Sequence, residues 1–86
     1  MKILITGGAG FIGSHLVDYL VTKKNIKKII VLDNIRDGSL KNLKNSTKSK
    51  KFFFYKKDIR NFNSIKNSFK NIDIVYHLAA LSDVVP

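Results

Sequence analysis

A cluster of glycines near the amino terminus is the first pattern that could bind a ligand. Residues 5–14 read ITGGAGFIGS, with four glycines in ten positions and apolar residues close on both sides. Glycine permits tight turns and lets backbone N–H groups approach a bound group closely. Such a turn, placed between a strand and a helix, can hold a phosphate on the unpaired N–H donors of the helix N-terminus. A glycine turn that binds nothing is the alternative.

The spacing of these glycines fits two related patterns. Residues 8–13 fit G-x-G-x-x-G, the stretch that starts at Gly7 fits G-x-x-G-x-x-G, and Asp33 follows twenty residues after Gly13. Glycines followed by an acid at this distance are typical of a dinucleotide site, where the carboxylate accepts hydrogen bonds from the adenosine ribose. Because a carboxylate would repel a 2′-phosphate, Asp33 favours NAD over NADP. An ordinary turn residue remains the alternative for Asp33.

Short apolar runs and helical spacings indicate the elements that position these residues. A helix is predicted from 11 to 24, where Ile12, Leu16, Val17 and Leu20 recur at helical spacing. A further helix is predicted over 62–69, a short one is weakly indicated at 40–43, and the lysine-rich residues 41–51 are expected to be a solvated loop. Four buried strands are predicted, at 2–6, 29–33, 52–55 and 73–80.

Alternation of strands and helices predicts an α/β fold with a doubly wound parallel sheet. In such a sheet, ligands bind beyond the carboxyl ends of the strands. Those ends are expected at Thr6–Gly7, Asp33–Asn34, Asp58–Ile59 and 78–80. The residues that could do chemistry therefore fall on one edge of the predicted sheet.

Composition narrows the class of protein. The 86 residues are 44% hydrophobic, which is enough for a small core. They contain no cysteine, which excludes a disulfide framework. No apolar run approaches membrane-spanning length, and we expect a cytoplasmic protein. The net charge of +10 comes from lysines spread over the chain, with arginine only at Arg36 and Arg60. This distribution favours a solvated surface over nucleic-acid binding.

Several of these stretches together resemble a known family. Residues 6–14, TGGAGFIGS, are similar to the nucleotide-binding signature of the extended short-chain dehydrogenase/reductases. LDN at 32–34 with GS at 38–39, DIR at 58–60 and HLAA at 77–80 agree in order and spacing, and the nearest group is the NAD-dependent nucleotide-sugar epimerases and dehydratases. The resemblance implies the amino-terminal half of a Rossmann doubly wound parallel sheet, with strand order 3-2-1-4 and NAD as cofactor.

The resemblance also assigns the phosphate turn and the adenosine site. It implies that three glycines form the turn and that two helix-opening residues offer backbone to the pyrophosphate. It further implies a pair of residues at the ribose and a pair that flank the adenine. These are Gly7, Gly10 and Gly13; Phe11 and Ile12; Asp33 and Asn34; and Asp58 and Ile59. A helix cap or turn residue is the alternative for Asp58.

The path toward the nicotinamide is implied to lie after the fourth strand. There, Leu78, Ala79, Ala80 and Leu81 would line the cofactor, and close packing is the alternative for the two alanines. His77, inside the strand, is expected to be a core histidine whose ring is hydrogen-bonded, rather than an acid or base. His15 is expected at the surface of the first helix, and no ligand cluster indicates a metal site.

Catalysis in this family implies a Tyr-x-x-x-Lys pair on a later helix, where the Tyr removes a proton from a sugar hydroxyl. Tyr19 and Lys23 have that spacing, but they lie on the first predicted helix, where Tyr19 is about 9 Å of helix rise beyond Gly13. We expect this match to be a coincidence and assign no catalytic residue. Residues 1–86 are therefore expected to be an amino-terminal fragment, a partial NAD-binding domain that is inactive alone.

The function implied for the longer enzyme is hydride transfer between NAD and a carbon of a nucleotide-linked sugar, as in an enzyme like UDP-glucose 4-epimerase. A non-catalytic protein of the same fold that senses or binds a dinucleotide is the alternative. Neither the sugar nor the choice between epimerase, dehydratase and reductase can be read from these residues. A homodimer of the full-length protein stays open.

Overall fold

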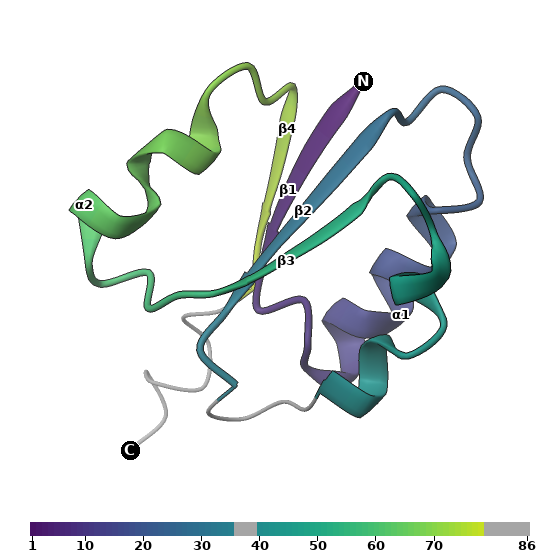
Figure 1. The fold of residues 1–86 in the computed structure, drawn as a ribbon, viewed down its shortest axis with the longest axis horizontal. Helices are drawn as coiled ribbons and strands as arrows, with labels where there is room; N and C mark the ends of the chain where they lie inside the picture. The colour runs from purple at the N-terminus through teal and green to yellow at the C-terminus, as the bar shows by residue number, and fades with distance from the viewer. Residues whose placement is uncertain (36–39, 79–86) are drawn as a thin grey trace.

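A computed structural model of the chain describes residues 1–35 and 40–78. Its centre is one parallel sheet in the order β3-β2-β1-β4, formed by β1 (Lys2–Thr6), β2 (Lys28–Asp33), β3 (Phe52–Lys56) and β4 (Ile74–His77) (Figure 1). The predicted strand order 3-2-1-4 is confirmed. β1 and β2 are almost wholly buried, because each has a neighbouring strand on both sides and apolar residues on both faces.

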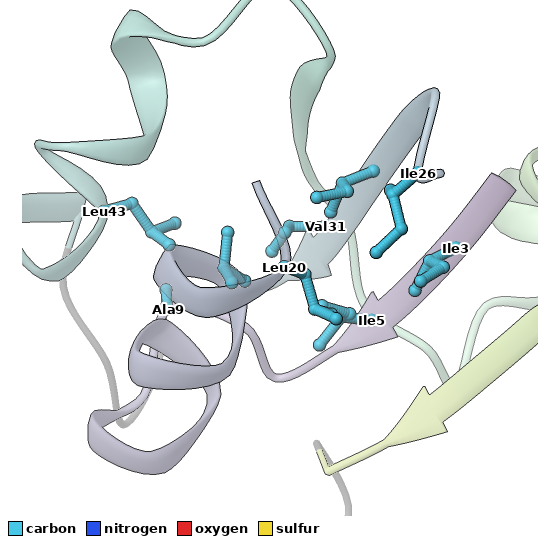
Figure 2. Packing of buried hydrophobic residues seen from close by; sticks show 9 residues of the cluster. Ile3, Ile5, Ala9, Leu20, Ile26, Val31 and Leu43 are labelled. Carbon is cyan, nitrogen blue, oxygen red and sulfur yellow. The ribbon is translucent and has the colours of Figure 1, made fainter. Parts of the chain in front are cut away.

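Helix α1 (Phe11–Leu20) covers one face of the sheet (Figure 1). Its Val17 and Leu20 pack with Ile3, Ile5 and Val31 from the two central strands (Figure 2). The helix ends at Leu20, earlier than the predicted residue 24. The Thr22 hydroxyl donates to the Tyr19 carbonyl at 2.6 Å, and the Thr22 N–H bonds the same oxygen at 3.2 Å, so a tight turn replaces the next helical turn.

The opposite face of the sheet carries a second, smaller cluster. Leu4, Ile30 and Leu32 from the strands pack with Ile65 of the short helix α2 (Phe62–Ile65), which a 3-10 turn η3 (Lys66–Phe69) continues. The predicted helix over 62–69 is thus an α-turn followed by a 3-10 turn. The outer strands are less buried than predicted, since Phe53, Tyr55 and Val75 are exposed on them.

Residues 41–51, expected to be a solvated loop, contain two 3-10 turns, η1 (Leu40–Leu43) and η2 (Ser46–Lys48). Leu43 is completely buried and belongs to the cluster under α1 (Figure 2). Ser46 is also completely buried, and its hydroxyl donates to Asp18 Oδ1 of α1 at 2.6 Å. The expectation was wrong for these two residues. The lysines around them do face solvent, but the lysine-rich pattern gives no sign that two positions between them face inward.

Candidate functional site

The carboxyl ends of the four strands meet at one edge of the sheet, as the sequence predicts. Three backbone hydrogen bonds join neighbouring ends just beyond the strands. Gly7 N–H donates to Leu32 O at 2.9 Å, Leu78 N–H to Thr6 O at 3.0 Å, and Lys57 N–H to Asp33 O at 3.1 Å. The glycine turn, Asp33, the segment leading to Asp58, and Leu78 are therefore side by side on this edge.

The glycine turn is a tight β-turn between β1 and α1. Gly10 N–H donates to Gly7 O at 3.2 Å, and Gly7 adopts a φ of 75°, a conformation that side-chain-bearing residues rarely take. A Cβ on Gly13 would lie 2.4 Å from Gly7 O and 2.8 Å from Gly8 Cα. The first turn of α1 is thus pressed against the glycine turn, and only glycine at 13 permits this approach.

Gly10 differs from these two glycines. Its φ of −73° and ψ of 174° are open to any residue, and among residues 1–35 and 40–78 a Cβ there would meet only Gly7 O, at an ordinary 3.5 Å. The protein's own packing therefore does not require glycine at position 10. A group that approaches the turn from outside would require it.

The N-terminus of α1 supplies donors next to Gly10. Gly10 is the N-cap residue and has no side chain with which to cap the helix, and the first turn has no acidic residue. The first N–H groups of an α-helix have no partner within the helix, so those of Phe11 and Ile12 are available to an anion. The side chains of these two residues are 75% and 73% exposed. The prediction that Ile12 belongs to the buried face was wrong, because that face follows Gly13, Val17 and Leu20.

Asp33 is buried at the end of β2, with 7% of its surface exposed. Its Oδ2 accepts a hydrogen bond from Ala9 N–H at 2.9 Å and its Oδ1 accepts one from Ile35 N–H at 2.8 Å. Ile35 adopts a φ of 63°, which is strained for a β-branched residue. The carboxylate is thus held by two backbone donors and touches the middle of the glycine turn. A carboxylate has about four acceptor positions, so it can also accept from ribose hydroxyls.

Asn42, a residue that the sequence reasoning missed, reaches the same turn. Its Nδ2 donates to the Ala9 carbonyl at 2.8 Å from η1, 33 residues along the chain. Asn42 stands in a lysine-rich run without periodicity, so the sequence carries no signal for this contact. The peptide groups on either side of Ala9 are consequently held from both sides, the N–H by Asp33 and the carbonyl by Asn42.

The residues expected at the adenine lie after β3. The Asp58 carboxylate is paired with the Arg60 guanidinium at 2.7 Å and accepts the Arg60 N–H at 2.9 Å, while the N-cap of α2 is Asn61. Asp58 therefore is a turn residue and not the helix cap. Ile59 packs against the cluster of the second sheet face, and Asn34 is half-buried directly after Asp33.

Thr6 joins β1 to β4 at the same edge. The completely buried Thr6 hydroxyl lies 2.8 Å from His77 Nδ1 and accepts the Leu78 N–H at 3.1 Å. His77 was expected in the core, but it is exposed, because β4 is a half-buried strand of alternating exposure. The predicted hydrogen bond to its ring is present, supplied by Thr6.

Tyr19 and Lys23, which have the spacing of a catalytic pair, lie away from the glycine turn, Tyr19 in the last turn of α1 and Lys23 after the end of the helix. Tyr19 is 58% exposed and the Lys23 ammonium lies 4.3 Å from the centre of its ring. This is a surface cation–π contact. Ala79, Ala80 and Leu81, implied to line the nicotinamide path, lie outside the described residues, as does Arg36.

In residues 1–35 and 40–78, no group of three or more His, Asp or Glu side chains could hold a metal ion. Within the same ranges, no helix has the length and apolarity needed to span a membrane.

Comparison with known proteins gives consistent matches. The family model for GDP-mannose 4,6 dehydratase matches residues 4–85. A dTDP-D-glucose 4,6-dehydratase of Dictyostelium discoideum is 51% identical over 86 residues, which are 96% of this chain and 20% of that protein. The crystal structure of a dTDP-glucose 4,6-dehydratase from Streptomyces venezuelae with NAD bound superposes with a TM-score of 0.87 at 33% identity, over 92% of this chain and 26% of that one.

A second solved structure agrees in fold. It is a UDP-glucuronic acid 4-epimerase from Bacillus cereus in complex with UDP-glucuronic acid and NAD, with a TM-score of 0.81 and 34% identity. The match covers 91% of this chain and 26% of the epimerase. The chain thus spans about a fifth to a quarter of the length of the relatives it matches.

Proposed function

The chain belongs to the GDP-mannose 4,6 dehydratase family, and from this premise we propose that it binds NAD as part of an enzyme acting on nucleotide-linked sugars. The matched dehydratase and epimerase structures were determined with NAD. Residues 1–86 are proposed to form part of a Rossmann NAD-binding domain, with the catalytic and substrate-binding parts elsewhere in the longer protein.

The observation that carries the proposal is that the described residues leave room for a side chain at Gly10, which is the N-cap of α1. Glycine at 10 serves no contact within the described structure, whereas glycine at 13 is required by a Cβ distance of 2.4 Å to Gly7 O. A pyrophosphate on the first N–H groups of α1 would use both the missing side chain and the free donors. The residues therefore fit the phosphates of a dinucleotide.

Asp33 and its neighbours are proposed to hold the adenosine half. The Asp33 carboxylate keeps acceptor capacity for ribose hydroxyls, and its negative charge disfavours the 2′-phosphate of NADP. Asn34 would assist at the ribose, and Asp58 and Ile59 would flank the adenine. Leu78, with Ala79, Ala80 and Leu81, would lead toward the nicotinamide.

Bound NAD would supply a hydride acceptor and donor for the sugar carbon. What these residues contribute is cofactor binding and orientation. Tyr19 is not the base of that reaction in this proposal, because it is exposed at the far end of α1 and pairs with Lys23. We therefore expect no turnover of a nucleotide sugar by the 86 residues alone. Conversion of UDP-glucose or dTDP-glucose by the purified chain would contradict this.

Substrate, location and assembly belong to the same proposal. The relatives named above act on dTDP-glucose and UDP-glucuronic acid, which supports a nucleotide sugar as substrate and leaves the sugar open. Epimerisation is an isomerase reaction, and the reduction of NAD is an oxidoreductase step. The proposal therefore includes both enzyme classes, isomerase and oxidoreductase. A chain without cysteine is consistent with a cytoplasmic location. A homodimer of the longer protein also remains a proposal.

Direct titration of the chain with cofactor tests the proposed function. Isothermal calorimetry with NAD and with NADP should give saturable NAD binding and an affinity for NADP lower by about tenfold or more, a difference of about 1.4 kcal/mol. Binding to duplex DNA that falls steeply with salt and is unaffected by NAD would instead favour a nucleic-acid protein. Absence of NAD binding by the folded chain would overturn the proposal.

A further inference from the structure

Asn42 contacts the glycine turn from a segment more than thirty residues further along the chain. Asn42 Nδ2 donates to the Ala9 carbonyl at 2.8 Å. The remaining groups around Ala9 are already engaged, since Ala9 N–H bonds Asp33 and Gly10 N–H bonds Gly7 O. Without Asn42, the Ala9–Gly10 peptide would be held only at its N–H, by Gly7 O. Asn42 adds a hydrogen bond at the carbonyl of that peptide.

The geometry of the peptide bond makes this contact consequential. The Ala9 carbonyl and the Gly10 N–H belong to one planar peptide group, which Asn42 holds at its oxygen and Gly7 O holds at its N–H. Gly10 is the N-cap of α1, and its peptide leads directly into the first N–H groups of the helix. Asn42 thus helps to fix the peptide that immediately precedes the Gly10–Phe11 peptide, the first whose N–H would face a pyrophosphate.

Asn42 is itself held in place by its neighbours. Leu43, the next residue of η1, is completely buried against α1. Four residues along the chain from Asn42, the buried Ser46 donates to Asp18 Oδ1 at 2.6 Å. The segment 42–46 is consequently bound to the glycine turn at one end and to the last turn of α1 at the other. Asn42 itself is exposed, but the backbone that carries it is anchored to α1 through the buried Leu43 and Ser46.

We propose that Asn42 is a positioning residue for the cofactor, which orients the glycine turn toward the pyrophosphate without touching the dinucleotide itself. The inference rests on the proposed NAD function. It separates the site into two parts, with Asp33 serving the ribose directly and Asn42 serving the phosphates through Ala9.

Two substitutions at Asn42 test the role. Asn42→Ala removes the side chain, and Asn42→Asp keeps its shape but replaces the donor with an acceptor that faces a carbonyl. Loss of one positioning hydrogen bond should lower the affinity for ADP, which carries the pyrophosphate, by about tenfold. Affinity for adenosine, which lacks phosphates, should stay within about twofold, since Asp33 is untouched. NMR titration of the full chain with each ligand measures both.

Asn45→Ala is the matched control on the same segment. Asn45 is exposed and its side chain makes no capping bond to η2, so this variant should bind ADP as the parent chain does. Equal losses for ADP and adenosine, or unchanged ADP affinity in both Asn42 variants, would overturn the positioning role. Loss of folding in both variants, followed by circular dichroism, would assign Asn42 to the fold and overturn it too. A parent chain that binds neither NAD nor ADP would remove the proposed function and this inference with it.

Discussion

Asp33 and Ala9, 24 residues apart in the sequence, are joined by a 2.9 Å hydrogen bond from the Ala9 N–H to Asp33 Oδ2. The bond ties the end of β2 to the middle of the glycine turn. Because Oδ1 accepts the Ile35 N–H as well, the carboxylate has a structural role in addition to the role proposed for it at the ribose. Substitution of Asp33 must therefore be measured by a quantity that separates the two roles.

The ratio of NAD to NADP affinity is such a quantity. Asp33→Asn preserves shape and one oxygen acceptor but removes the negative charge that disfavours a 2′-phosphate. We expect NAD affinity to fall and the NAD:NADP ratio to drop by about tenfold, close to 1.4 kcal/mol. Calorimetric titration with both cofactors measures this. A ratio equal to that of the parent chain would remove Asp33 from the ribose.

Replacement of Gly13 should damage the fold rather than only the site. Gly13→Ala places a methyl group 2.4 Å from Gly7 O and 2.8 Å from Gly8 Cα, and neither backbone atom can rotate away. We expect the free energy of unfolding to fall by about 1–3 kcal/mol or more, the usual effect of overpacking. Urea denaturation followed by circular dichroism measures the change. An unfolding midpoint unchanged from the parent would show that α1 does not press on the turn.

Leu43 and Leu40 provide a pair of matched positions in η1. Leu43 is completely buried, whereas Leu40 is 52% exposed. Leu43→Ala should lower the free energy of unfolding by about 2–5 kcal/mol, as expected when a buried leucine is truncated. Leu40→Ala should change it by less than about 0.5 kcal/mol. Thermal or urea unfolding of the two variants compares them directly, and similar losses in both would mean that η1 is not anchored to α1 through Leu43.

The arrangement of the strands was predictable from the sequence for a physical reason. Apolar runs such as 29–33 identify buried strands, and alternation with helices makes the sheet parallel, which brings Gly7, Asp33 and Leu78 to one edge. The strand order came from the family resemblance. These inferences depend on patterns that repeat along the chain and do not require the position of any single side chain.

The supporting contacts of the site were not predictable in this way. Asn42 and Ser46 each form one side-chain hydrogen bond to a residue that is 28 or more positions distant, and a lone polar residue among lysines carries no periodic signal. Ile12 has the spacing of a buried residue, yet it is 73% exposed. The face of α1 that lies against the sheet contains Gly13, Val17 and Leu20 and leaves Ile12 outside it. Such details follow from how the elements pack and not from their order.

The central claim is that a dinucleotide pyrophosphate lies against the glycine turn, and Gly10→Ala tests it most directly. In the part of the chain that the structure describes, the methyl group would meet Gly7 O at 3.5 Å and nothing closer, so the chain should fold with a free energy of unfolding within about 1 kcal/mol of the parent. Calorimetric titration with NAD should nevertheless show an affinity at least about tenfold lower, because the methyl occupies the space through which the phosphates approach. A folded Gly10→Ala chain that binds NAD as tightly as the parent would contradict the account.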